Sequence, residues 1–101
     1  MPMIKTLPTV NVAAVAAQAG VELGATPFQI GGNCTFELDA PMAGAIVLTL
    51  QGSPDNATWT TIRTINAAQS ATKVFELTDL PKYFRTNVTT AGTAQTLNPI
   101  L

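Results

Sequence analysis

The sequence predicts an all-β protein: a single antiparallel β-sandwich or small barrel with extended arms at its ends. Short runs of alternating apolar and polar residues recur along the chain, which is the pattern of strands that bury one face. Glycine and proline separate these runs at short intervals, as turns between strands require. The length of 101 residues suits one domain of ordinary size, so we assign residues 1–101 to a single domain.

The two ends of the chain, about residues 1–9 and 95–101, are predicted to be the extended arms. Both are apolar and both contain proline. Two arrangements stay open: each arm lies along its own domain, or it docks on a neighbouring subunit. The second arrangement gives a set of candidate assembly contacts, the apolar side chains Met1, Met3, Ile4, Leu7, Leu97, Ile100 and Leu101.

Residues 10–20 are compatible with two structures. Their alanines tolerate a helix, whereas their β-branched valines favour a strand, and we expect a strand. The apolar run Val10–Val21 is too short to span a bilayer and is interrupted by Asn11 and Gln18. We therefore expect no membrane segment.

Four later runs alternate with a period of two residues, so one face of each run is expected to be buried. The residues on these faces are Cys34, Phe36 and Leu38, then Ile46, Leu48 and Leu50, then Phe75 and Leu77, and finally Phe84, Thr86 and Val88. Their regular spacing favours an antiparallel sandwich or small barrel over a mixed fold.

Residues 45–65 are predicted to form a hairpin. The sequence Ser53-Pro54-Asp55-Asn56 has the composition of a turn, and the following residues 58–65 are nearly all β-branched or aromatic. The alternation slips between Trp59 and Ile62. This slip predicts either a β-bulge or a strand that is buried on both faces.

The composition excludes several classes of function. Charged residues make up 11% of the chain, against roughly 25% in an average protein, and histidine is absent. With Cys34 as the single cysteine, the sequence excludes histidine catalysis, Cys–His dyads, the usual zinc sites and disulfide frameworks. The net charge is −1 and the five basic residues do not cluster, so we expect no nucleic-acid partner.

The remaining catalytic chemistry would need paired carboxylates. Glu37 and Asp39 lie two residues apart on the outward face of one predicted strand and could in principle bind calcium or act as a glycosidase pair. A calcium loop concentrates several oxygen ligands, and no such loop is present in the sequence. A solvated strand face is the favoured interpretation. We predict no catalytic residue, metal site or cofactor, and a protein that is not an enzyme.

Trp59, Tyr83 and Arg85 have two interpretations. They could form an exposed aromatic platform on which sugars or bases stack. Alternatively, Trp59 anchors the core and Tyr83 caps a strand. The second interpretation is favoured because a sandwich this small usually needs its few large aromatic side chains in the core.

Two stretches resemble small β-sandwich virion proteins of tailed phages. In Gln51–Ile62 (QGSPDNATWTTI) a strand ends in a Gly-Ser-x-Asp turn and a Thr-Trp-Thr strand follows. In Phe75–Thr89 (FELTDLPKYFRTNVT) a Leu-Pro-x-Tyr motif precedes an arginine-bearing strand, as in discoidin-like and fibronectin-like sandwiches. The resemblance covers about residues 45–90 and implies a capsid decoration (cement) protein or another small head or tail component. The chain is shorter than the sugar-binding discoidin-like modules and lacks their aromatic residues.

A surface with few charges favours association, which is consistent with this resemblance. We therefore predict a non-catalytic phage structural protein that decorates and stabilises the capsid by bridging neighbouring subunits. Its expected partners are the major capsid protein and copies of itself, with a trimer as the arrangement at a capsid threefold axis. It would be made in the host cytoplasm and reside on the capsid surface. The alternative is a carbohydrate- or receptor-binding module of a tail or surface fibre, which requires Trp59 and Tyr83 to be exposed together.

Overall fold

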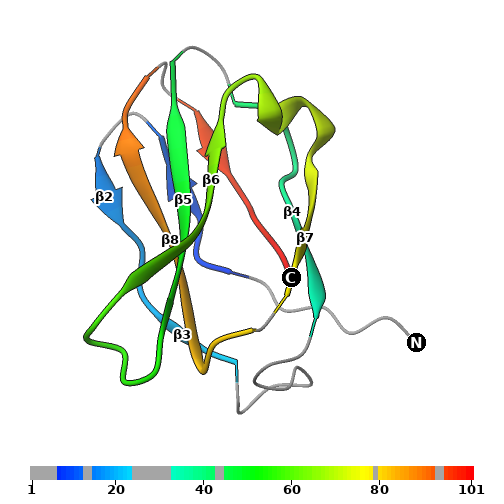
Figure 1. Ribbon diagram of the computed structural model, residues 1–101. Helices are drawn as coiled ribbons and strands as arrows, with labels where there is room; N and C mark the ends of the chain where they lie inside the picture. The colour runs from blue at the N-terminus through cyan, green and yellow to red at the C-terminus, as the bar shows by residue number, and fades with distance from the viewer. Residues whose placement is uncertain (1–6, 13–14, 24–32, 43–44, 79, 93–94) are drawn as a thin grey trace.

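The computed structural model describes residues 7–12, 15–23, 33–42, 45–78, 80–92 and 95–101. Within these residues the regular elements are β-strands and one 3-10 turn, so the predicted all-β class is confirmed (Figure 1). The elements are β1 (Val10–Asn11), β2 (Ala16–Ala17), β3 (Val21–Glu22), β4 (Cys34–Glu37), β5 (Val47–Ser53), β6 (Thr60–Asn66), η1 (Gln69–Thr72), β7 (Val74–Leu77), β8 (Tyr83–Thr90) and β9 (Thr96–Leu97).

The larger layer is a five-stranded antiparallel sheet. Its strand order is β2-β8-β5-β6, and β3 pairs with the part of β8 that β2 leaves free. The two longest pairings, β5 with β8 and β5 with β6, form its centre. On β8 the side chains of Phe84, Thr86 and Val88 face the core, and those of Tyr83 and Arg85 face outward.

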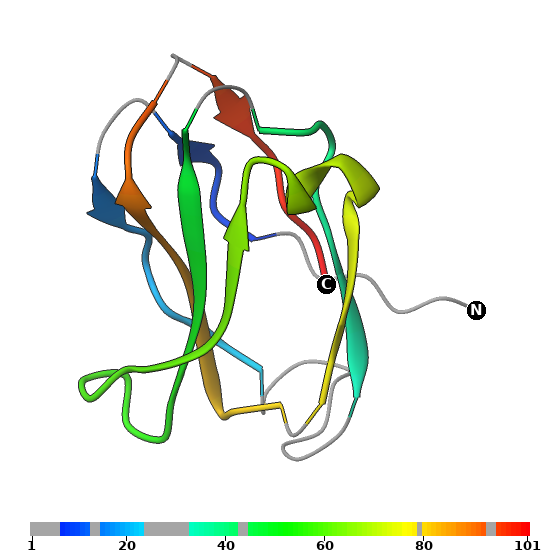
Figure 2. The same ribbon diagram turned by 45° about the horizontal axis from the view of Figure 1, so that its top comes forward.

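The second layer is assembled around the C-terminal segment. Strand β9 pairs with β1, and the backbone of Leu7 extends this pairing by donating to the Pro99 carbonyl at 3.1 Å. On the other side Ile100 exchanges two backbone hydrogen bonds of 2.9 and 3.0 Å with Glu37 of β4, which in turn pairs with β7. Residues 95–101 therefore lie between β1 and β4, as the red segment in Figure 2 shows.

The facing sides of the two layers form one core. Phe36 of the second layer connects them. Its ring centroid lies 6.3 Å from that of Phe75 in the same layer and 6.1 Å from that of Phe84 in the larger sheet. The residues predicted to be buried are buried, with Cys34 half-buried at the margin. The fully or nearly fully buried members of that prediction are Phe36, Leu38, Ile46, Leu48, Leu50, Phe75, Leu77, Phe84, Thr86 and Val88.

The described parts of both arms lie along their own domain, which is the first of the two arrangements left open above. Leu7, Leu97 and Leu101 are buried in the core, and Ile100 is half-buried. These side chains are buried by other residues of the same chain, so they offer little free apolar surface to a neighbour. The remaining candidate contacts lie outside the described residues: Met1, Met3 and Ile4.

The hairpin over residues 45–65 and its bulge are confirmed. Strands β5 and β6 pair antiparallel, with Leu50 opposite Arg63 and Gln51 opposite Thr61, which leaves Ile62 as an extra residue. The alternative of burial on both faces is wrong, because β6 is an edge strand and all but one of its residues are exposed. A bulge and a charged side chain such as the exposed Arg63 are features that protect edge strands from unwanted pairing.

The turn of this hairpin is built around Asp55. Its Oδ1 atom accepts hydrogen bonds from the backbone N–H groups of Ala57 at 2.9 Å and Thr58 at 2.8 Å, and from the Ser53 hydroxyl at 2.9 Å. Asn56 adopts a positive φ of 59°, a conformation that asparagine tolerates better than most residues. The turn chemistry predicted from the sequence is therefore present.

Residues 10–20 form strands and no helix in their described part, as expected. Strands β1 and β2 are only two residues long and belong to different layers. Residues 13–14, which connect them, lie outside the described residues. The single predicted strand is therefore two short ones.

The 3-10 turn η1 was not predicted. Asn66 and Gln69 stabilise its start reciprocally, because each side-chain oxygen accepts the other residue's backbone N–H, at 2.8 and 3.0 Å. This is the hydrogen-bond pattern of a capping box. The buried Ser70 hydroxyl donates to the Ala67 carbonyl at 2.6 Å and accepts the Met42 N–H at 2.7 Å, which fixes the turn to the second layer.

Thr86 has a buried hydroxyl without a hydrogen-bond partner among the described residues. Burying an unpaired hydroxyl costs free energy, and valine has nearly the same shape without it. We expect Thr86→Val to raise the free energy of unfolding by about 1 kcal/mol, measured by urea denaturation. The control is Thr49→Val, which removes a hydroxyl that donates to the Asn87 carbonyl at 3.1 Å and should not stabilise. A Thr86→Val protein less stable than the wild type would contradict this expectation.

Candidate functional site

The outer face of the five-stranded sheet carries a row of connected polar side chains. Gln51 of β5 lies opposite Thr61 of β6 on one side and opposite Arg85 of β8 on the other. The Arg85 Nε donates to the Gln51 Oε1 at 2.7 Å, and the Gln51 Nε2 donates to the Thr61 hydroxyl at 3.5 Å. The row thus crosses three neighbouring strands.

Trp59 lies over this row. The guanidinium carbon of Arg85 is 4.3 Å from the centroid of its ring, which is a cation–π contact. On the other side of β8, Gly20 approaches the ring so closely that a Cβ there would lie 2.9 Å from Cη2 and would also meet the Asn56 side chain. The tip of the β5–β6 hairpin is therefore held on the outer face of the sheet.

The favoured sequence interpretation of Trp59 is wrong. The side chain is half-buried and is not part of the core, which is filled by phenylalanine and aliphatic residues. Tyr83 is likewise half-buried, at the start of β8, with the Lys82 ammonium 5.6 Å from its ring centroid. Both rings belong to the outer face, but the contact with Arg85 leaves Trp59 only partly available for stacking.

The close approach of Gly20 to Trp59 can be tested by substitution. We expect Gly20→Ala to displace the ring, because the new methyl group would overlap ring carbons that a packed side chain cannot easily move. The emission of the single tryptophan should shift to longer wavelength and the Tm should fall by several degrees. Ala19→Ser, at an exposed neighbouring position, is the control. Unchanged emission in Gly20→Ala would show that the ring does not lie against Gly20.

The two outward carboxylates do not act as a pair. Glu37 is exposed, whereas the Asp39 carboxylate accepts hydrogen bonds from the backbone N–H and from the side-chain amide of Asn98, both at 3.0 Å. The Asn98 side chain also accepts the Thr9 hydroxyl at 3.0 Å, so Asp39 fastens both arms to β4. The described residues contain no group of three or more metal-binding side chains that could hold a metal ion.

These hydrogen bonds lower the pKa of Asp39 below its ordinary value of 3.8, the backbone bond from Asn98 most strongly. A carboxyl group with a depressed pKa stabilises the fold above its unfolded pKa, and this contribution is lost as the pH falls through the folded pKa. We expect stability to decline below about pH 4, and Asp39→Asn to remove part of that decline. Thermal unfolding of both proteins between pH 2 and pH 7 measures this decline as a fall in Tm. If the Tm of Asp39→Asn fell with pH in the same way as that of the wild type, Asp39 would make no contribution to it.

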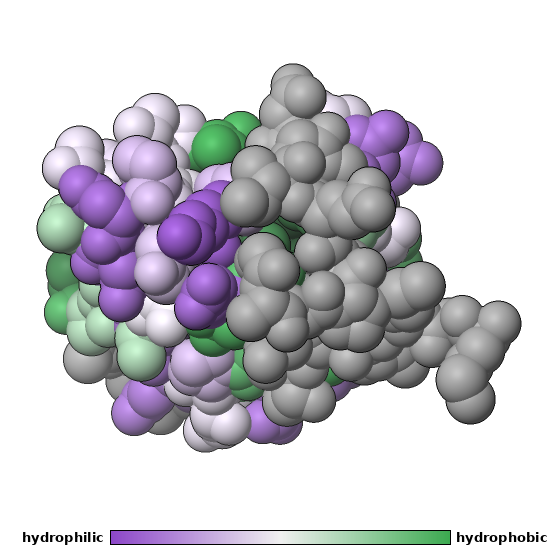
Figure 3. Space-filling view, turned by 90° about the horizontal axis from the view of Figure 1, so that it is seen from below, coloured by the Kyte–Doolittle hydropathy of each residue, from purple (hydrophilic) through white to green (hydrophobic). Residues whose placement is uncertain are grey.

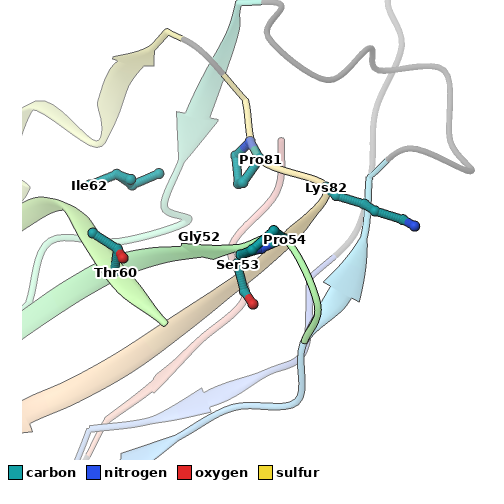
Figure 4. A pocket seen from close by; sticks show the side chains of 7 residues that line it. All are labelled: Gly52, Ser53, Pro54, Thr60, Ile62, Pro81 and Lys82. Carbon is teal, nitrogen blue, oxygen red and sulfur yellow. The ribbon is translucent and has the colours of Figure 1, made fainter. Parts of the chain in front are cut away.

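An apolar hollow of ≈ 510 Å³ lies beside the edge strand β6 (Figure 4). The Pro81 ring packs on Gly52 at its base, where a Cβ on Gly52 would come within 2.7 Å of the proline Cγ. Figure 4 shows the Lys82 side chain extending away from the hollow, so no charged group points into it from the residues drawn. The lining residues are Gly52, Ser53, Pro54, Thr60, Ile62, Pro81 and Lys82.

A second, smaller hollow of ≈ 290 Å³ lies beside Cys34 on strands β4 and β7. Burial raises the pKa of the Cys34 thiol, which keeps it protonated at neutral pH and therefore weakly nucleophilic. Seen from below, polar and apolar side chains are interspersed over the described part of the surface (Figure 3). Neither hollow brings an acid, a base and a nucleophile together within the described residues.

No family model, curated protein or solved structure matches the chain. Among the described residues, no helix has the length and apolar character needed to span a membrane. The candidate functional site is the outer face of the five-stranded sheet around Arg85 and Trp59, hereafter the Arg85 face.

Proposed function

We propose that the protein is a non-catalytic structural component of a tailed-phage particle, which decorates and stabilises the capsid by binding neighbouring subunits. The observation that carries the proposal is the composition of the Arg85 face. Most of its side chains are uncharged and polar, with Arg85, two aromatic rings and the exposed Glu22 among them. They are Glu22 on β3, Gln51 and the buried Thr49 on β5, Thr61 and Thr64 on β6, Tyr83, Arg85 and Asn87 on β8, and Trp59 from the hairpin.

The arginine and the two aromatic rings of this face are typical of a protein-binding surface. Interfaces are enriched in aromatic residues and arginine and depleted of lysine and of acidic residues, and arginine, tryptophan and tyrosine account for most binding hot spots. Threonine, asparagine and glutamine lose less on desolvation than charged side chains do. The face can therefore be covered by a neighbour at a modest cost in free energy.

In this proposal the Arg85 face makes the contact with the neighbour, and the described parts of the arms do not. The described arm residues Leu7, Leu97 and Leu101 are already buried within the chain. The two layers already share one core among the described residues, so binding requires no rearrangement of them. A sandwich with a polar outer face is suited to adding onto a preassembled surface.

Binding to phage heads assembled without this chain tests the proposal. The purified protein should cosediment with such heads to saturation, and Asn87→Trp should weaken the binding at least tenfold because the larger side chain would hold the neighbour away from the Arg85 face. The matched control is Thr35→Trp, which adds the same bulk to the exposed outer face of the second layer. Absence of wild-type binding would refute the proposal, as would saturable binding to a glycan array that Trp59→Ala abolishes.

A further inference from the structure

We propose that the neighbouring subunit places an aspartate or glutamate carboxylate on Arg85. The inference rests on the proposed function and specifies the chemistry of the partner: a protein surface with an acidic side chain that faces the five-stranded sheet. Three features of Arg85 support it, namely its free hydrogen-bond donors, its fixed orientation and its uncompensated charge.

Arg85 uses only part of its hydrogen-bonding capacity. A guanidinium group has five N–H donors, and here the Nε–H donates to Gln51 while the two terminal nitrogens have no partner among the described residues. The terminal N–H groups form the fork that binds a carboxylate through two parallel hydrogen bonds. The atoms needed for carboxylate binding are thus available in the free protein.

The orientation of Arg85 is fixed before any partner binds. The 2.7 Å bond to Gln51 holds one edge of the guanidinium, and the Trp59 ring at 4.3 Å covers one of its faces. Gln51 in turn donates a long hydrogen bond of 3.5 Å to the Thr61 hydroxyl. A side chain held in this way loses little conformational entropy on binding, which makes it a favourable anchor for a partner.

The charge of Arg85 is not neutralised within the described part of the chain. The other charged groups nearest in strand register are Lys82, which adds positive charge, and Glu22 of β3, which is exposed and lies opposite Tyr83. Asp55 of the adjacent hairpin uses its Oδ1 atom within the turn. A partner that covers the half-buried guanidinium must supply a negative charge, because an unpaired charge in a dry interface is strongly unfavourable.

The shape around Arg85 favours a protein over a small acidic ligand. Small molecules bind in concave sites that enclose most of their surface. The two hollows described above are lined by other residues, and Arg85 borders neither. The outer face of a sheet suits the extended, moderately polar surface of another subunit.

Heads assembled without this chain are the probe for Arg85 as well. We expect Arg85→Gln to bind them at least tenfold more weakly than the wild type, and Arg85→Lys, which keeps the charge but not the fork, to be intermediate. Lys82→Gln, at an exposed neighbouring cation, is the matched control and should change the affinity less than about threefold. Tryptophan emission and Tm establish that each variant remains folded.

A charge-reversal experiment separates a direct contact from a structural role. Arg85→Glu should abolish binding, and suppressor heads should carry an acidic-to-lysine change in the subunit that covers the face. Heads that bind the wild type and Arg85→Gln equally, with the same salt dependence, would overturn the inference and leave the proposed function standing. Heads that do not bind the wild type would overturn both. Competition by an acidic saccharide that abolishes binding would assign the site to a carbohydrate.

Discussion

Removal of residues 96–101 is expected to unfold the protein and not merely to free an arm. This segment lies in the middle of the second layer, so its loss deprives β1 of its strand partner and removes the hydrogen bonds that join Ile100 to β4. It also removes Leu97 and Leu101 from the core, each worth about 2 kcal/mol of apolar burial. Small domains are stable by only about 5–15 kcal/mol, so the combined loss is comparable to the whole.

Far-ultraviolet circular dichroism and dispersion of the amide NMR spectrum measure this effect. The control is Thr96→Ala, which changes an exposed side chain of the same strand and should leave both spectra unchanged. A truncated protein with the wild-type spectrum and Tm would show that the C-terminal segment is a dispensable arm.

Phe36→Ala is expected to give the largest loss of stability of any single substitution considered, about 3–5 kcal/mol in the free energy of unfolding. Phe36 is completely buried and its ring contacts Phe75 in its own layer and Phe84 in the other. Truncation therefore opens a cavity where the two layers meet. Part of the loss comes from the cavity, because the surrounding side chains collapse only partially.

Urea denaturation followed by circular dichroism measures this loss. Thr35→Ala on the same strand is the control, because Thr35 is exposed and lies opposite Glu76 on the outer face. A loss below about 1 kcal/mol in Phe36→Ala would place the junction between the layers elsewhere.

The parts of the fold that could be predicted are those in which a strand is long enough to show a period. Phe75 and Leu77 of β7, and Phe84 and Val88 of β8, alternate with exposed or half-buried residues and are buried as expected. The hairpin was predictable because its turn residues are local and Asp55 forms its hydrogen bonds within three residues. Its bulge was predictable because the alternation of side chains in the sequence shifts by one residue between Trp59 and Ile62.

The second layer could not be predicted in the same way. Strands β1 and β9 have two residues each, and a two-residue strand has no period to detect. Their pairing joins Val10 to Leu97, which are separated by most of the chain. The sequence showed that both ends are apolar, but apolar ends fit a neighbouring subunit as well as the chain's own core.

The candidate site was only partly visible in the sequence. Trp59, Tyr83 and Arg85 were singled out together, and the structure places all three on one face. The position of Trp59 depends on Gly20, which lies between β2 and β3 and has no side chain to block the ring. Gln51, which orients Arg85, was missed as a site residue. Gln51 could have been recognised as an outward-facing residue because it alternates with Leu50 and Gly52, which are buried.

We propose that the Arg85 face, and not the ends of the chain, makes the contact with the capsid. A cryo-electron microscopy map of the phage particle would show which surface is covered. We expect the five-stranded sheet to lie against a neighbouring subunit, with Trp59 and Gln51 covered and an acidic side chain within hydrogen-bonding distance of Arg85. A map in which this face is open to solvent while the second layer or the chain ends make the contacts would disprove the proposal.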